Sequence, residues 1–123
     1  MNKVVKFEIP ADDMGRAEKF YKEVFNWEIN RYSEEYLSAN TEETSNDLMS
    51  TEPGVINGGI QKRSDRAKAP SFVIMVDDID KSIEKIQTSG GKMAFPKEEV
   101  GEMGFYAQFD DPEGNRIGIF QKH

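Results

Sequence analysis

The sequence contains no cysteine and a single histidine, which stands at the last position, His123. Without cysteine the chain has no disulfide, no zinc–thiolate site and no thiol nucleophile. A lone histidine at a chain end, where the backbone commonly frays, argues against a Ser-His-Asp triad and against a metal site built from imidazoles. Any chemistry is therefore expected to use carboxylates, lysines or neutral polar side chains.

Basic residues and long apolar runs are also scarce. The chain has 23 acidic and 16 basic residues, a net charge of −7, which argues against nucleic acid and anionic membranes as partners because both attract basic patches. No apolar run reaches the roughly 18 residues of a membrane-spanning helix. Lys3 and Lys6 interrupt the apolar stretch that a signal peptide would need, so we expect a cytoplasmic protein.

Apolar periodicity predicts a domain that mixes strands and helices. The chain has 123 residues, of which 37% are hydrophobic, enough for one ordinary domain with a core. Asp13 and Asp78 are placed to cap two helices, which end near Asn26 and Gly90. Strands are expected over 4–9, where Pro10 ends the first of them, and over 27–32, 36–39, 55–62, 70–76, 92–95, 105–109 and 115–121. The acidic segment 34–52 reads as a loop, with the short strand 36–39 inside it, and serves as a plain connection or as a substrate lid.

The two halves of the chain repeat one pattern. "IPADDMGRA" at 9–17 aligns with "IMVDDIDKS" at 74–82, an offset of 65 residues since 74 − 9 = 65. Each half then reads as a strand, a capped helix and further strands, which indicates a duplicated βαβββ unit. We expect module one at about 1–63, a linker at about 64–69 and module two at about 70–123, within one domain. The predicted fold class is α+β, with the two modules forming a curved mixed sheet around a cup-shaped cavity.

Four stretches carry a resemblance to a known family. They are "IPADDMGRAEKFYKEVFNW", "PGVINGGIQKR", "VDDIDKSIEKIQTSGG" and "DDPEGNRIGIF". In this order they resemble the vicinal oxygen chelate superfamily of glyoxalase I (lactoylglutathione lyase), bleomycin-resistance proteins and extradiol dioxygenases, and in particular its glyoxalase-like single-domain subgroup. The resemblance implies paired βαβββ modules, usually a homodimer, with a ligand or metal ion in the cup of the sheet.

The resemblance also implies four strand positions at which metal-using members carry His, Glu or Gln. Here these positions match Lys6, Ser71, Gly118 and either Gly58 or Gly59, of which strand alternation favours Gly59. A lysine ammonium has no lone pair, serine is a poor ligand and glycine has no side chain to offer. We therefore expect no metal ion at the usual site and no other cofactor.

The remaining candidates are polar residues on the predicted cavity face. Lys6 and Glu8 lie two apart on the opening strand, where they form either a structural ion pair or a contact to a polar ligand. They are also the weak candidates for a general acid or base. Arg116 is otherwise expected in solvent, and Phe120 in the packing of the sheet. The predicted ligand-binding set is Lys6, Glu8, Asn57, Gln61, Ser71, Arg116 and Phe120.

Three functions remain open at this point. The first is metal-free binding of an unknown small molecule in the cavity, as in bleomycin-resistance-type proteins. The second is a lyase- or isomerase-type enzyme with a rearranged site, which a buried Glu8 with a shifted pKa would favour. The third is a structural or regulatory dimeric module, which a cavity filled by side chains would favour. Whether the protein is an enzyme is not decided by the sequence, because fold alone does not set function.

Overall fold

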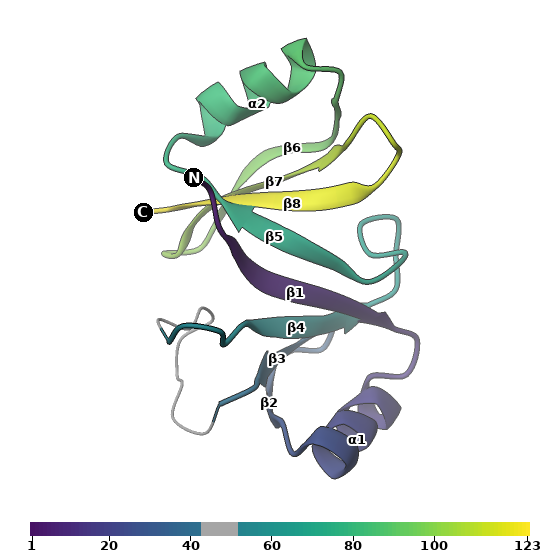
Figure 1. Cartoon of the computed structure of the whole chain (residues 1–123). Coiled ribbons are helices and arrows are strands. Elements are labelled where there is room, and N and C mark those ends of the chain that lie inside the picture. The colour runs from purple at the N-terminus through teal and green to yellow at the C-terminus, as the bar shows by residue number, and fades with distance from the viewer. Residues whose placement is uncertain (43–51) are drawn as a thin grey trace. The chain divides into compact units, whose positions relative to one another are not determined.

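The computed structural model describes residues 1–42 and 52–123, which form eight strands and two helices (Figure 1). In chain order these are β1 (Val4–Ala11), α1 (Met14–Phe25), β2 (Glu28–Ser33), β3 (Tyr36–Asn40), β4 (Asn57–Lys62), β5 (Ser71–Met75), α2 (Ile79–Thr88), β6 (Lys92–Val100), β7 (Gly104–Asp110) and β8 (Arg116–Lys122). The chain divides into two compact units. We call Val5–Ser71 the N-terminal unit, and Met1–Val4 together with Phe72–His123 the C-terminal unit.

The two units have the same topology. In the N-terminal unit the strands follow the order β2-β3-β4-β1, and β1 runs parallel to β4 while the other neighbours are antiparallel. In the C-terminal unit the order is β6-β7-β8-β5, and β5 runs parallel to β8. Each unit also carries one helix between its first two strands (Figure 1). The predicted α+β class and the repeated βαβββ arrangement are confirmed.

Both helices begin where the sequence predicts. The Asp13 carboxylate accepts a hydrogen bond from the Arg16 N–H at 2.9 Å, and the Asp78 carboxylate accepts one from the Lys81 N–H at 3.1 Å. Each bond satisfies an amide that the first helical turn leaves without an intrahelical partner. Helix α1 ends at Asn26, whose φ of 59° is left-handed and which tolerates that conformation better than most residues.

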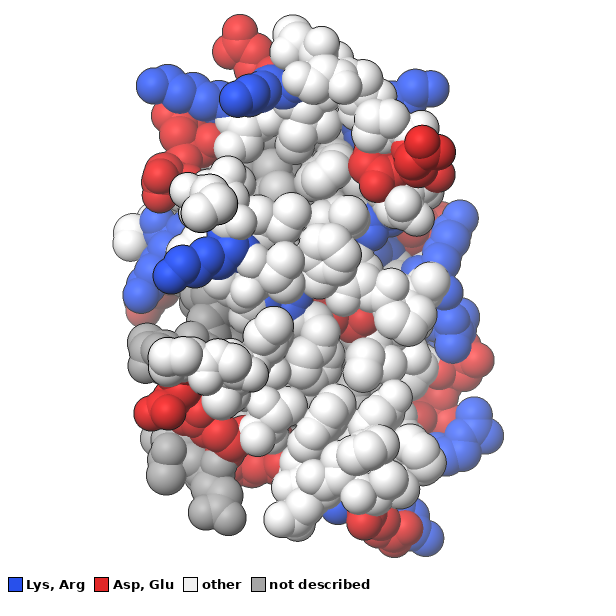
Figure 2. All heavy atoms as spheres, viewed as in Figure 1, with Lys and Arg blue, Asp and Glu red and all other residues white. Residues whose placement is uncertain are grey.

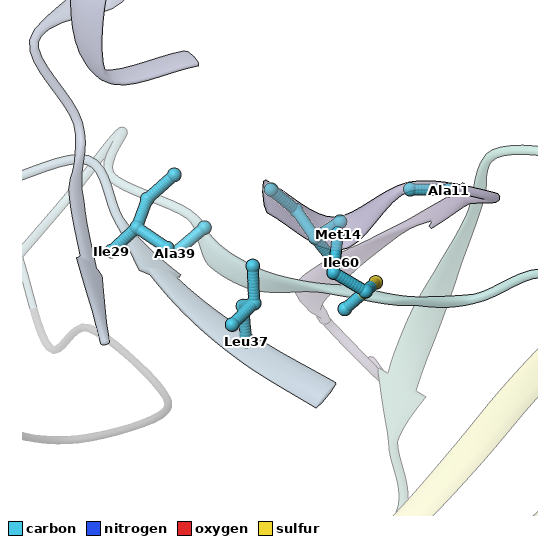
Figure 3. Packing of buried hydrophobic residues seen from close by; sticks show 6 residues of the cluster. All are labelled: Ala11, Met14, Ile29, Leu37, Ala39 and Ile60. Carbon is cyan, nitrogen blue, oxygen red and sulfur yellow. The ribbon is translucent and has the colours of Figure 1, made fainter. Parts of the chain in front are cut away.

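Each unit has its own apolar core. In the N-terminal unit the buried side chains come from β1, α1, β2, β3 and β4 and pack on one another (Figure 3); they are Ala11, Met14, Ile29, Leu37, Ala39 and Ile60. Trp27 closes this core by stacking on Tyr21, with ring centroids 4.9 Å apart. In the C-terminal unit the buried residues are Val76, Ile79, Ala107 and Ile119.

Two strands extend beyond their predicted ends. β1 continues past Pro10 to Ala11, because the Ala11 carbonyl accepts a hydrogen bond from the Arg63 N–H at 3.0 Å and the strand stays paired with β4. β6 runs to Val100 because its later residues pair with β7 across a register shift. The short strand predicted inside the acidic segment is confirmed as β3. Residues 43–51 of that segment lie outside the described residues, so the choice between connection and lid stays open.

Charges of both signs are interspersed on the face drawn in Figure 2, where lysine and arginine neighbour aspartate and glutamate. No large patch of basic residues occurs on that face. Neither helix in the described part of the chain is long and apolar enough to cross a membrane.

Candidate functional site

The strand registers align the two units residue by residue. On the parallel pair β1 and β4, Glu8 lies opposite Gly59. On the parallel pair β5 and β8, Val73 lies opposite Gly118. Glu8 and Val73 are separated by the 65 residues of the sequence repeat, since 73 − 8 = 65. The register therefore makes Gly59, rather than Gly58, the counterpart of Gly118.

In each unit a tyrosine of the third strand covers this glycine. A Cβ atom on Gly118 would lie 2.7 Å from the Tyr106 hydroxyl, closer than van der Waals contact allows, and a Cβ atom on Gly59 would overlap the Tyr36 hydroxyl. Each tyrosine stands opposite the residue two positions beyond its glycine; the pairs are Tyr36 with Gln61 and Tyr106 with Phe120. Glycine is needed at both positions because another side chain approaches the backbone there.

Four polar side chains gather on this face of the N-terminal unit, and we call them the polar cluster: Lys6, Glu8, Tyr36 and Gln61. The Lys6 Nζ lies 3.3 Å from one carboxylate oxygen of Glu8, and the Gln61 Nε2 donates to the other oxygen at 3.4 Å. The same ammonium lies 4.8 Å from the centroid of the Tyr36 ring, within cation–π range. The predicted salt bridge between Lys6 and Glu8 is present.

Glu8 is a buried carboxylate. Its exposed fraction is 7%. Burial raises the pKa of Glu8 above its usual value, and the charge and hydrogen bond of Lys6 offset this only in part. A carboxyl group with a raised pKa exchanges its proton closer to neutral pH than a surface glutamate does. Glu8 can therefore act as a hydrogen-bond acceptor when charged or as a donor when protonated.

The C-terminal unit shows that the fold does not require this polar cluster. At the position of Glu8 it has Val73, which is 2% exposed, and at the position of Gln61 it has Phe120. The backbone register and the tyrosine over glycine are the same in both units. Burying a charged pair where an apolar pair fits equally costs desolvation energy, which points to a role other than folding.

The other predicted ligand residues lie apart from this cluster or have structural partners. Asn57 is fully buried, and its Oδ1 accepts a hydrogen bond from the Thr41 N–H at 2.8 Å. Arg116, expected in solvent or at an anion, instead forms a two-point ion pair with Asp110, at 2.8 and 3.0 Å. Ser71 begins β5, and Phe120 is half-buried opposite Tyr106.

Tyr36 and Tyr106 are the residues that sequence reasoning missed. Tyr36 was assigned only to a short strand in an acidic segment. The signal that would have found them is the repeat, because each half has a tyrosine in its third strand ahead of a glycine in its fourth. Their position over that glycine follows only from the antiparallel register.

The residues at the family's ligand positions do not fit a divalent metal ion. The Lys6 ammonium stands beside Glu8, and the positions of Gly59 and Gly118 are covered by tyrosine rings. Across residues 1–42 and 52–123, no group of three or more histidine, cysteine or carboxylate side chains is placed to hold a metal. Glu8 alone offers a carboxylate, and its oxygens already face an ammonium and an amide.

A pocket of about 320 Å³ lies elsewhere on the N-terminal unit. Its lining residues are Phe25, Asn26, Glu28, Asn40, Thr41 and Glu42. None of the predicted ligand residues lines it. The polar cluster and this pocket are therefore separate features of the unit.

The chain is similar to known proteins along most of its length. It is 33% identical over 117 residues to a glyoxylase-like domain-containing protein of Didymella fabae, covering 91% of this chain and 88% of that protein. A crystal structure of a glyoxalase/bleomycin resistance protein/dioxygenase superfamily member from Vibrio splendidus 12B01 covers 99% of this chain and 100% of its own, at 17% identity and a TM-score of 0.65. A variant of the Streptomyces coelicolor methylmalonyl-CoA epimerase covers 99% and 98%, at 9% identity and a TM-score of 0.67.

These likenesses differ in what they support. The two solved structures, at such low identity, show the fold alone. The family model for the Glyoxalase/Bleomycin resistance protein/Dioxygenase superfamily matches residues 3–119, nearly the whole chain. Together with the Didymella relative, this match agrees with the duplicated βαβββ topology described above. The chain therefore belongs to the Glyoxalase/Bleomycin resistance protein/Dioxygenase superfamily.

Proposed function

We propose that this protein binds a small molecule at the polar cluster of its N-terminal unit without the help of a divalent metal ion. The observation that carries the proposal is the buried Lys6–Glu8 pair, which stands where the C-terminal unit has an apolar residue in the same register. A structural pair is expected where a fold demands it, but the same fold accepts Val73 at the position of Glu8.

The cluster has the composition of a binding site. A few polar groups on an otherwise apolar surface fix the orientation of a ligand and give specificity. Lys6, Gln61 and Tyr36 supply donors, while Glu8 supplies an acceptor or a donor according to its protonation. Gly59 lacks a side chain, so the Tyr36 ring lies directly over the β4 backbone beside these groups.

The test combines metal analysis with ligand screening. Protein purified without chelators is analysed for bound metal and then titrated with nickel, zinc, iron and manganese; we expect no stoichiometric binding. A fragment library is screened by chemical-shift changes of backbone amides, with shifts expected at Lys6, Glu8 and Gln61. The paired variant Lys6→Ser with Glu8→Val, which copies the C-terminal unit, should lose these shifts, whereas the surface variant Glu18→Gln should keep them. One metal ion per chain, or shifts unaffected by the paired variant, would refute the proposal.

A second candidate function is acid–base catalysis of the lyase or isomerase type, with Glu8 moving the proton. It is favoured by the burial of Glu8 and by its raised pKa, because a carboxyl group that titrates nearer neutrality is better matched to proton transfer. The discriminating experiment is exchange of acidic C–H protons of bound compounds with deuterium oxide. Exchange that disappears in Glu8→Gln, while binding persists, would establish catalysis in addition to binding.

We also propose that the chain forms a homodimer, as the family resemblance implies. Light scattering coupled to size-exclusion chromatography measures the mass directly, and a mass near 28 kDa is expected, twice the 14.0 kDa of one chain. A mass near that of one chain at micromolar concentration would contradict the dimer. The outcome is independent of ligand binding at the polar cluster.

A further inference from the structure

We propose that the ligand of the polar cluster carries a carboxylate or a similar oxyanion, held by Lys6 and the Tyr36 hydroxyl, and that its binding is accompanied by proton uptake at Glu8. This inference rests on the proposed function and names the chemical class of the ligand. It also assigns a ligand-contacting role to Tyr36.

The first argument is the balance of donors and acceptors. Lys6 brings three N–H donors, Gln61 brings two and Tyr36 one hydroxyl, while Glu8 is the acidic member of the cluster. The oxygens of Glu8 already accept from the Lys6 ammonium at 3.3 Å and from the Gln61 amide at 3.4 Å. The donors outnumber the acceptors, so the complementary ligand group is rich in acceptors, as a carboxylate is.

The second argument is the order in which an incoming group meets the charges. The side chain of Lys6 is 19% exposed, whereas that of Glu8 is 9% exposed. A ligand arriving from solvent therefore reaches the ammonium before it reaches the carboxylate. Attraction at the accessible charge favours an anionic head group over a cationic one.

The third argument is the place of Tyr36. Its hydroxyl is buried and lies over Gly59, which is directly opposite Glu8 on the neighbouring strand. The Lys6 ammonium lies 4.8 Å from the centre of the same ring, so the phenol and the ammonium converge on one region. Two donors of this kind, one charged and one neutral, are the usual requirement for holding an oxyanion.

A carboxylate ligand would bring a second negative charge close to Glu8. Two carboxylates at short range cannot both stay ionised at low cost, so one takes a proton from solvent and shares it in a hydrogen bond. The groups that face Glu8 within the unit are Lys6 from its own strand, Gln61 from β4 and Tyr36 from β3. Burial already favours the protonated form of Glu8, which lowers the cost of this uptake.

The experiment uses three probes that share a phenyl body and differ in head group: phenylacetate, phenylacetamide and phenethylamine. Binding to the full chain is followed by amide chemical shifts and by calorimetry. We expect phenylacetate to bind about tenfold or more tightly than the other two, the effect of one charge-assisted hydrogen bond. Calorimetry in two buffers of different ionisation enthalpy should show proton uptake, and affinity should rise as pH falls.

Variants separate the roles within the cluster. Glu8→Gln imitates the protonated side chain, so it should bind phenylacetate at least as tightly as the parent and lose the proton uptake. Lys6→Met and Tyr36→Phe should each weaken phenylacetate binding, by about tenfold for the charged contact and about threefold for the neutral one. Glu18→Gln, at a surface ion pair, should change nothing. If Lys6→Met does not fold, the proton uptake of the parent protein still decides the question.

The outcomes distinguish this inference from the proposed function. If phenethylamine or phenylacetamide binds at the cluster more tightly than phenylacetate, the oxyanion is refuted while small-molecule binding stands. Phenylacetate binding without proton uptake, or unchanged in Lys6→Met, also refutes it. If none of the three probes perturbs the cluster, both proposals fail.

Discussion

Replacing Lys6 with serine and Glu8 with valine would give β1 the residues that β5 carries at the equivalent positions, Ser71 and Val73. Val73 is 2% exposed in the same register, so the position of Glu8 is expected to accommodate valine without strain. The exchange removes a buried ion pair and the acceptor of the Gln61 amide, while the half-buried Gln61 can turn toward water. We expect the paired variant to be more stable than the parent.

The magnitude follows from the two opposing contributions. Replacing a buried ion pair with well-packed apolar residues is neutral or stabilising by about 1–4 kcal/mol. Because the Lys6 side chain keeps 19% of its exposure, its desolvation is incomplete and the lower part of that range applies. A gain of about 1–2 kcal/mol would raise Tm by about 4–8 °C in a chain of this size. Lys6→Ser alone, which leaves the Glu8 charge buried without its ammonium, should instead cost about 1–3 kcal/mol at neutral pH.

Urea unfolding monitored by tryptophan fluorescence measures these changes. The chain has a single tryptophan, Trp27, which stacks on Tyr21 in the core of the N-terminal unit and so reports on the unit that is altered. Glu18→Gln is the matched control, because its partner Lys22 lies 3.9 Å away at the surface and its loss should change stability by less than about 0.5 kcal/mol. If the paired variant is clearly less stable at an unchanged m-value, the fold needs the ion pair and the comparison between the units fails.

Three further predictions concern the same face of the sheet. Burial raises the folded-state pKa of Glu8 above its unfolded value, so the unfolding free energy should fall as pH rises through that interval, and Glu8→Gln should flatten this fall in melts between about pH 4 and 8. Gly59→Ala should lose about 1–3 kcal/mol because its methyl group overlaps the Tyr36 ring, and adding Tyr36→Ser should restore part of the loss; an unaffected Tm would contradict the close approach. Gly118→Glu should not bind nickel or zinc tightly and should be destabilised against Tyr106, so tight metal binding measured by calorimetry would show that the assignment of the ligand positions is wrong.

Much of the fold could be read from local signals. The caps at Asp13 and Asp78 depend on a side chain bonding to an amide three residues away, and the structure shows both bonds. Boundaries were predicted less well where pairing decides them. β6 extends to Val100 because its partner strand continues beside it, and no local signal in the sequence marks that end.

For the site, the sequence supplied the candidates but not their grouping. Lys6 and Glu8 were paired correctly, because residues two apart on a strand share a face. Arg116 was expected in solvent or at an anion, and its two-point pair with Asp110 depends on the β7–β8 register. Tyr36 was missed for a similar reason, since its place over Gly59 is set by how β3 and β4 align.

The sequence by itself determined the class of fold, the duplication and the poverty of metal ligands at the family's positions. Periodicity, capping residues and side-chain chemistry are local properties, and each can be read without knowing which strands become neighbours. Only the tertiary structure decided which polar groups meet. The hydrogen bond from Gln61 to Glu8 joins residues 53 apart in the chain, and it requires the parallel pairing of β1 with β4. Burial, which raises the pKa of Glu8, likewise depends on what packs around a side chain, and the same glutamate in an unfolded chain would be an ordinary solvated carboxylate.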